Sequence, residues 1–446
     1  QVRQARRENQ PEERLHGLMR QARELQEELQ RITIRLRAED PEALVGFGAP
    51  LTPDDLLPLF PPDGSGCLVD LYLGGQEGIV LLAFRDGMHV NMIGMIVPAL
   101  DRQVFVEEAK QWFLVVNPRQ PKHMNEGLRS LAKFLHDRLM CGLGQFLCQH
   151  GYWQVTIIPH LMTHAMPLHL APLCETDDLK LFYEHFAVSY APCVQLALTT
   201  ALRPRPETFI RGELPALLVA DPQENLPATR LEQKNVCEQL AHHPWQAAPV
   251  PQHSVTGQQT NLDEVIQQLP TAGMIDIATH AEFIGGDPYG SGLYFAKGDN
   301  QELKLWTVDE IYASPHLKNN PVVILSACES GMSYFDESSE IVALPPAFVC
   351  IGAAAVLSSL WPVEDVSTSF LVERFVYHLL DPGETPATAL GTACRDVRQI
   401  SREEALKRCD EIVQEIEERD PHFETCRKAY ERIVGMQQRI ASGPER

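Results

Sequence analysis

The chain has 446 residues, of which 44% are hydrophobic and 22% charged, so it can bury a sizeable core and is predicted to form two to four domain-sized units. No apolar run approaches the roughly 20 residues that span a bilayer, and the first segment lacks an apolar signal core, so we expect no membrane insertion and no export. The formal charge of −22 argues against a nucleic-acid surface, because neutralising phosphates needs clustered Lys and Arg. It favours a basic or neutral protein substrate.

The eleven cysteines form no CxxC pair and are odd in number, which fits neither a zinc site nor a disulfide framework. We therefore expect mostly reduced core thiols, no metal and no cofactor. A chain of this kind is typical of the cytoplasm.

Residues 1–54 are predicted to be a helical N-terminal segment. Apolar residues recur there at helical spacing: Leu15, Leu18, Leu25, Leu29 and Ile32. Such a stripe buries little by itself, so this helix is expected to dock on the main body or on a segment of a longer parent protein.

From residue 67 the pattern changes to short β-prone runs at 67–73, 79–84 and 88–96. Gly74-Gly75 and Asp86-Gly87 separate them and indicate hairpins. A helical stretch over 125–148 and a buried strand over 155–158 are predicted next.

After about residue 205 apolar strands alternate with amphipathic helices, which predicts an α/β fold with a mostly parallel sheet flanked by helices. The predicted strands cover 216–220, 274–278, 322–327 and 353–359. The predicted helices cover 229–241, 262–269, 344–350, 366–380 and 385–400, and Thr260 with Asp263 suggests a capping box. Residues 401–446 are predicted to be a charged helical tail.

Two of these strands end in residues that carry chemistry. The strand over 274–278 leads to Thr279-His280-Ala281, and the strand over 322–327 leads to Cys328. Open parallel sheets place reactive groups beyond the carboxyl ends of their strands, so neighbouring strands would bring His280 and Cys328 together.

A thiol with a pKa of about 8.5 is only a few per cent ionised at neutral pH and needs a base nearby, which His280 can supply. The backbone amides of Ala281 and Cys328 are the best candidates for the oxyanion hole. A buried core thiol and a structural histidine remain the alternatives for each residue taken alone.

The sequence resembles the CHAT domain, a caspase-related peptidase module that is also akin to the separase protease domain. The resemblance covers about residues 55–400 and is carried by five motifs: Ile158-Pro159 with 168–173 (LHLAPL), 218–222 (LVADP) with Leu226-Pro227, 278–281 (ATHA), 325–331 (LSACESG) and 360–365 (LWPVED). The catalytic histidine and cysteine of the family map onto His280 and Cys328.

The resemblance implies a caspase-like fold in which a degenerate half, residues 55–205, packs against a catalytic half, residues 206–400. It also implies a regulatory protein or sensor module as a partner, because CHAT domains commonly follow helical repeats. Two positions depart from the family: Ala281 stands where glycine is frequent, and Asp276 where a histidine is common. Both leave the rate of catalysis open.

In this fold the pocket for the residue before the cleaved bond is expected to draw on Asp221, Glu329, Glu364 and Asp365. Acidic residues there favour a basic side chain. The alternatives are a turn at Asp221-Pro222 and a helix start at Glu364-Asp365. His160, His164 and His169 lie close in sequence, but the prolines between them argue against a metal site.

The sequence thus predicts a cysteine endopeptidase that cleaves a protein substrate through a Cys-His dyad and is switched by a partner. A catalytically silent caspase-like scaffold is the main alternative. A hydrolase of small amides or esters would use the same acyl chemistry. The natural substrate and the activating signal stay open.

Overall fold

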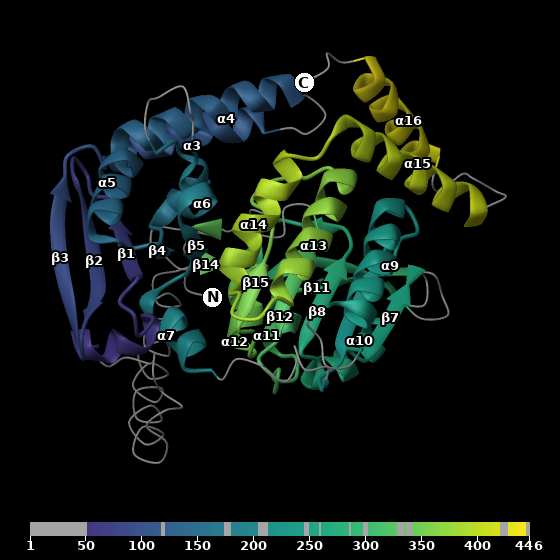
Figure 1. Ribbon diagram of the computed structural model, residues 1–446, viewed down its shortest axis with the longest axis horizontal. Coiled ribbons are helices and arrows are strands. Elements are labelled where there is room, and N and C mark those ends of the chain that lie inside the picture. The colour runs from purple at the N-terminus through teal and green to yellow at the C-terminus, as the bar shows by residue number, and fades with distance from the viewer. Residues whose placement is uncertain are drawn as a thin grey trace, which may run out of the picture.

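The fold is seen in a computed structural model of the chain (Figure 1). The structure describes residues 51–116, 121–173, 180–203, 213–244, 249–257, 260–284, 287–297, 302–327, 334–335, 341–419 and 427–442. The predicted N-terminal helix therefore lies outside the described residues, apart from its last four positions.

The first half contains a mixed five-stranded sheet in the order β3-β2-β1-β4-β5. Its strands are β1 (Gly66–Tyr72), β2 (Gly78–Asp86), β3 (His89–Val97), β4 (Gln154–Ile158) and β5 (Ala187–Tyr190). β1, β2 and β3 pair antiparallel, so both predicted hairpins are confirmed, while β4 pairs parallel with β1 and β5.

One face of this sheet carries the core of the first half, because the alternate residues Val69, Leu82 and Ile157 are fully buried against helices. The covering helices are α3 (Arg102–Val115), α4 (Pro121–Leu135), α5 (Cys141–His150) and the short α6 (Phe182–His185). The helix predicted over 125–148 is confirmed as α4 and α5, joined by a π-helical turn at His136–Met140. The sequence pattern had not predicted the helix α3.

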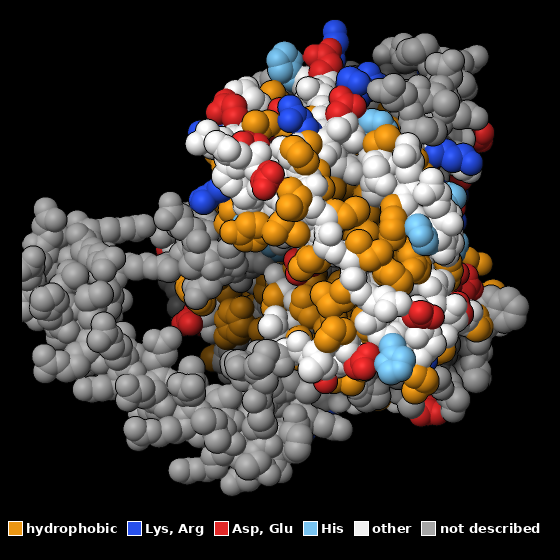
Figure 2. Space-filling model, turned by 90° about the vertical axis from the view of Figure 1, so that its left-hand side faces the viewer, with side chains coloured by type: hydrophobic (Ala, Val, Ile, Leu, Met, Phe, Trp, Pro, Cys, Tyr) orange, Lys and Arg blue, Asp and Glu red, His pale blue; other side chains and the backbone are white. Residues whose placement is uncertain are grey.

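The other face of the first sheet is only partly covered. The 3-10 helix η1 (Pro53–Leu59) and the helix α7 (Val194–Leu202) cover one end of it. Beyond them lie apolar side chains that are 37% to 66% exposed: Tyr72, Ile79, Leu81, Met92 and Ile96. Figure 2 shows hydrophobic side chains gathered on the side of the molecule where β3 lies.

The second half contains a five-stranded sheet in the order β15-β12-β8-β6-β7, with every neighbouring pair parallel. Its strands are β6 (Ala216–Ala220), β7 (Gln252–Thr256), β8 (Met274–Ala278), β12 (Val322–Ser326) and β15 (Ala355–Leu357). The four predicted strands are confirmed, and β7 was missed because its residues are largely polar and none of them is buried.

Helices cover both faces of this parallel sheet, as its nearly continuous apolar strands require. On one face lie α10 (Leu262–Gln268), α11 (Val308–Tyr312) and α12 (Leu344–Cys350); on the other lie α9 (Pro227–His242), α13 (Asp365–Leu379) and α14 (Pro386–Arg398). The mixed α/β fold class is thus confirmed. The predicted cap of α10 is wrong: Asn261, and not Thr260, is the N-cap, and its side chain accepts from the Asp263 N–H.

Shorter elements complete the second half. A three-stranded sheet is formed by β9 (Ala281–Glu282), β10 (Gly292–Lys297) and β11 (Glu302–Thr307), and a small hairpin by β13 (Tyr334–Phe335) and β14 (Ile341–Val342). The 3-10 helices η6 (Leu269–Thr271) and η7 (Pro288–Gly290) also belong to this half, whereas η3 (Leu161–Ala165) and η4 (Leu168–Leu170) lie in the first half, between β4 and β5.

The two halves meet through specific side chains. The ring of Trp361, from the second half, packs edge-on against Trp112 of α3 with centroids 5.7 Å apart and joins the core of the first half. Arg203, after α7, donates to the carbonyls of Val349 and Ala353 at 2.8 and 2.6 Å. The predicted boundary at 205/206 falls in residues 204–212, outside the described part, and stays a prediction.

The predicted charged helical tail contains two helices, α15 (Arg402–Arg419) and α16 (Arg427–Ser442). They pack on each other and on the first turns of α9 and α13 (Figure 1). Among the described residues no helix is long and apolar enough to cross a membrane. The eight cysteines of the described part form no disulfide with one another.

Candidate active site

The two strands predicted to carry the dyad are neighbours in the sheet. β8 and β12 pair in parallel, and Ala278 lies opposite Ser326 at their carboxyl ends. His280 is the second residue after β8, and in the sequence Cys328 is the second residue after β12. Cys328 and Glu329 lie outside the described residues. The last described residue before them, Ala327, is buried and faces the same pocket as His280.

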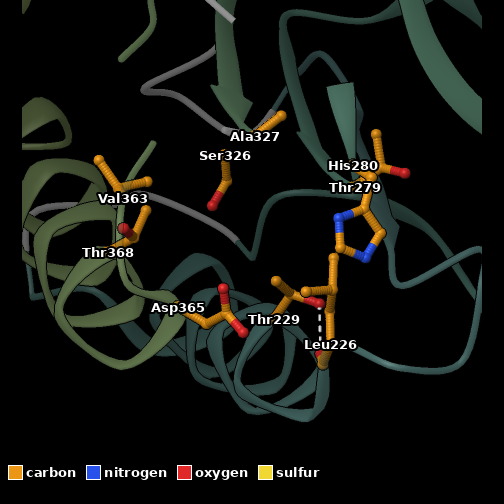
Figure 3. A pocket seen from close by; sticks show the side chains of 9 residues that line it. All are labelled: Leu226, Thr229, Thr279, His280, Ser326, Ala327, Val363, Asp365 and Thr368. Atoms are coloured by element: carbon orange, nitrogen blue, oxygen red, sulfur yellow. Dashed lines mark hydrogen bonds between the residues drawn. The ribbon is translucent and has the colours of Figure 1, made fainter. Parts of the chain in front are cut away.

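This pocket opens between the ends of β8 and β12 and the first turns of α9 and α13. Its lining residues are Leu226, Thr229, Thr279, His280, Ser326, Ala327, Val363, Asp365 and Thr368. In Figure 3 the imidazole of His280 faces the side chains of Ser326 and Asp365 across the pocket. A basic ring, an acidic group and the strand end that precedes the cysteine therefore border one space.

The His280 ring is oriented by a hydrogen bond. Its Nε2 lies 2.8 Å from Oδ1 of Asn225, in the loop after β6. With that oxygen as acceptor, Nε2 carries the proton and Nδ1 is the unprotonated nitrogen. Figure 3 shows one ring nitrogen directed into the pocket, and since Nε2 is bound to Asn225 this is Nδ1.

Three effects act on the charge of His280. Burial lowers its pKa, the carboxylate of Asp365 raises it, and the guanidinium of Arg432 lowers it, with a net pKa below the usual value. A lowered pKa keeps the imidazole neutral near pH 7, and a neutral imidazole can accept a proton.

The loop that carries Asn225 is held by Asp221. One carboxylate oxygen of Asp221 accepts from the N–H groups of Asn225 and Leu226 at 2.7 and 2.8 Å, and the other pairs with Arg230 at 2.6 Å. The backbone of Asp221 has φ of 50°, in the left-handed region, which a tight loop start requires. The Asp221 side chain is fully buried. These contacts match the turn that was the alternative interpretation, and Asp221 is not among the residues that line the pocket.

Glu364 and Asp365 begin α13, which also matches the alternative interpretation for this pair. Glu364 is the N-cap residue, and its carbonyl accepts from the hydroxyls of Ser367 and Thr368. Asp365 differs from Asp221, because it lines the pocket. Its carboxylate is paired with Arg432 of α16. Of the described acidic residues predicted to bind substrate, Asp365 is the one that shares a pocket with His280.

The backbone contact of His280 with β10 fixes the direction of the Ala281 amide. The Tyr294 N–H donates to the His280 carbonyl at 2.9 Å, so that carbonyl points toward β10. In a trans peptide the following N–H, that of Ala281, points the opposite way. This amide is therefore not part of the ladder with β10.

Two acidic side chains are buried beneath the site. Asp276 of β8 and Glu232 of α9 are 2% and 1% exposed. Burial raises the pKa of Asp276 to about 7, and burial together with the charges of Asp276 and Glu373 raises the pKa of Glu232 well above its usual value. The Ser326 hydroxyl donates to Glu232 at 3.1 Å. Asp276 thus occupies a layer below the pocket and does not belong to its lining.

The neighbouring histidines His160 and His169 have structural contacts. Nδ1 of His160 accepts from the Leu73 N–H at 3.0 Å, and Nδ1 of His169 lies 2.9 Å from the Tyr190 hydroxyl. Within the described ranges no three His, Cys, Asp or Glu side chains are grouped as metal ligands would be.

Sequence reasoning missed two residues of this site, Asn225 and Arg432. Asn225 had a usable signal, because it follows the carboxyl end of a predicted parallel strand, where functional loops lie. Arg432 had none: it lies 152 positions after His280 in a tail whose packing no local pattern specifies.

Comparison with known proteins places the chain in a family. The CHAT domain family matches residues 129–425, about two thirds of the sequence. No curated protein matches. Among solved structures, two crystal structures of the Saccharomyces cerevisiae separase–securin complex, at 2.6 and 3.0 Å resolution, are similar, each with a TM-score of 0.49 and 10% identity over 77% of this chain. The matched part spans only 30% and 29% of those separase chains. The family match is decisive by its extent: the chain belongs to the CHAT domain family.

Proposed function

We propose that the protein is a cysteine endopeptidase in which Cys328 is the nucleophile and His280 the general base. One observation carries the proposal: His280 and Ala327, the residue before Cys328, line one pocket at the carboxyl ends of two neighbouring parallel strands. Membership of the CHAT family supports it, and the resemblance of the motifs at 278–281 and 325–331 implies that these two residues correspond to the family's catalytic pair.

The proposed chemistry is acyl transfer. Nδ1 of His280 takes the thiol proton of Cys328, and the sulfur attacks the carbonyl carbon of the cleaved peptide bond. The amides of Ala281 and Cys328 would stabilise the negative oxygen of the tetrahedral intermediate. The imidazolium returns the proton to the leaving amine, and a water molecule then hydrolyses the thioester with His280 again as base.

On the substrate side we assign Asp365 to the recognition of a cationic side chain, because its carboxylate lines the pocket opposite His280. Glu364 and Glu329 remain proposed substrate contacts. Asp221 takes a different role in this proposal: it positions the Asn225 loop, and so acts on His280 through Asn225.

A regulatory protein partner and a cytoplasmic location complete the proposal. The separase crystals contain securin bound to separase, which is a property of that protein. For this chain the partner is inferred from its family, and the reducing compartment from the odd number and scattered spacing of its cysteines.

The experiment replaces Cys328 by Ala and measures cleavage of a co-expressed candidate protein and labelling by a peptide electrophile. The matched control is Cys148→Ala, which removes an exposed cysteine of the first half. We expect Cys328→Ala to abolish both signals, and the control to keep them. Equal cleavage by Cys328→Ala and the unmodified protein would reject Cys328 as the nucleophile, and absence of cleavage and labelling in both would favour the catalytically silent scaffold.

A second measurement separates peptidase from small-molecule hydrolase. Peptide electrophiles of increasing length should label Cys328 faster than the same warhead on a single amino acid, because an endopeptidase binds residues on both sides of the reacting bond. Labelling that does not depend on peptide length would favour hydrolysis of small amides or esters.

A further inference from the structure

The C-terminal helices lie over the catalytic edge of the parallel sheet. Ile412 and Ile416 of α15 and Ile433 of α16 are buried against Leu231 of α9 and Val366 of α13. Val366 lies in the first turn of α13 and Leu231 in the second turn of α9, and both helices begin where the carboxyl ends of the strands open. Figure 1 shows α15 and α16 on this side of the second half.

α15 is firmly attached to the body. The guanidinium of Arg408 forms two hydrogen bonds to the Glu373 carboxylate at 2.6 and 2.7 Å, and a third to the Ser369 hydroxyl at 3.1 Å. The central carbon of the Arg408 guanidinium, Cζ, lies 4.1 Å from the centre of the Phe370 ring. Arg408 and Glu373 are both 7% exposed. This ion pair fixes α15 on α13.

α16 places the positively charged side chain of Arg432 next to the pocket. The guanidinium of Arg432 contacts the carboxylate of Asp365, which lines the pocket with His280. The Asp365 side chain is 13% exposed, and that of Arg432 is 45% exposed. The arginine therefore lies on the solvent side of the carboxylate. The positive charge of Arg432 also lowers the pKa of His280, so it acts within electrostatic range of the dyad.

We propose that the Asp365 carboxylate is a binding site for a guanidinium or ammonium group of the substrate, and that Arg432 occupies it as an internal competitor. A cationic substrate side chain and Arg432 need the same oxygen atoms, so binding of one excludes the other. The apparent affinity for a cationic substrate is then reduced by the fraction of molecules in which Arg432 is bound. Whatever draws α16 away opens the site.

The test compares Arg432→Gln with Lys407→Gln. Both changes remove one positive charge from the C-terminal helices, but Lys407 is 77% exposed and pairs only at the surface with Glu411 of its own helix. The first readout is the dissociation constant of methylguanidine, which is measured by titration from the changes in the NMR signals of the His280 ring. We expect about 5- to 10-fold tighter binding in Arg432→Gln than in the unmodified protein or in Lys407→Gln. The gain should disappear in Arg432→Gln with Asp365→Asn.

The second readout is the labelling rate of Cys328 by two peptide electrophiles that differ only in having Arg or Leu before the warhead. The internal competitor predicts that Arg432→Gln raises the Arg-to-Leu ratio of rates by a similar factor. Equal changes for both reagents, or a loss for both, would show that Arg432 only holds the helices together. If Arg432→Gln unfolds α16, Arg432→Met keeps the aliphatic stem and serves instead.

The two proposals fail separately. This inference rests on the proposed function only for the labelling experiment. Absence of any Cys328 labelling, together with tighter methylguanidine binding in Arg432→Gln, would reject the peptidase and keep the cation site. Labelling at Cys328 with unchanged methylguanidine binding would overturn the internal competitor and keep the peptidase.

Discussion

Nε2 of His280 lies 2.8 Å from Oδ1 of Asn225, and this contact joins the end of β8 to the loop after β6. A single hydrogen bond thereby sets which ring nitrogen carries the proton and where the other one points. Since the loop itself is held by Asp221, the orientation of the proposed base depends on a buried carboxylate that lies outside the pocket.

The first prediction concerns Asn225. Asn225→Ala should slow labelling of Cys328 by a peptide electrophile about 10- to 100-fold, because a misoriented base loses much of its effect. Asn225→Asp should instead raise the pKa of His280, since a carboxylate stabilises the imidazolium, and the pH profile of labelling should shift upward. The pH profile distinguishes a positioning role from a general loss of folding. An unchanged rate of Cys328 labelling in Asn225→Ala would contradict a positioning role for Asn225.

The second prediction concerns the ion pair of Asp221 and Arg230, whose side chains are 0% and 10% exposed. Asp221→Ala should lower the free energy of unfolding by about 3–5 kcal/mol, because it leaves the guanidinium of Arg230 buried without a counter-ion. Urea unfolding measures this, with Asp263→Ala, at an exposed first-turn position of α10, as the control. A loss as small as that of the control would show that the pair is not needed.

The sequence predicted those parts of the fold that depend on local pattern. The strands β6, β8 and β12 are apolar runs bounded by turn residues, and the positions just beyond the carboxyl ends of β8 and β12 hold His280 and Cys328. It could not predict β7, which is polar and is recruited by pairing with β6. It also could not distinguish Asp221 from Asp365, because both follow strands, and only tertiary packing decides which carboxylate is enclosed.

The third prediction is a pH dependence of stability that comes from Asp276. Its pKa is about 7 in the folded protein and near 3.9 in the unfolded chain, so between these values the folded state holds the extra proton. The stabilisation is complete below about pH 4 and is lost as the pH rises toward 7, with a slope of up to about 1.4 kcal/mol per pH unit. The pKa of Glu232 is also raised and adds in the same direction.

The measurement is the free energy of unfolding in urea at several values between pH 4 and 7. Asp276→Asn keeps the shape of the side chain and removes its titration, so its curve should be flatter than that of the unmodified protein. Asp309→Asn, an exposed position of α11, should leave the slope unchanged. Parallel curves for Asp276→Asn and the unmodified protein would show that Asp276 does not titrate in this range.

The last prediction concerns the attachment of α15, which depends on Arg408 and Glu373. Arg408→Met should lower stability by about 3–5 kcal/mol, because it leaves the buried Glu373 carboxylate without its cation, whereas Arg408→Met with Glu373→Leu should recover most of the loss. Hydrogen exchange should show faster exchange in α15 for the single variant than for the double one. Lys407→Met, on the exposed side of the same helix, controls for removing a charge.

The loss of the Arg408–Glu373 ion pair should also affect the pocket. Because α16 packs on α15, detaching α15 from α13 should release Arg432 from Asp365, and Arg408→Met should then bind methylguanidine more tightly than Lys407→Met does. If binding stays equal while α15 exchanges freely, the contact between Arg432 and Asp365 does not depend on the anchor.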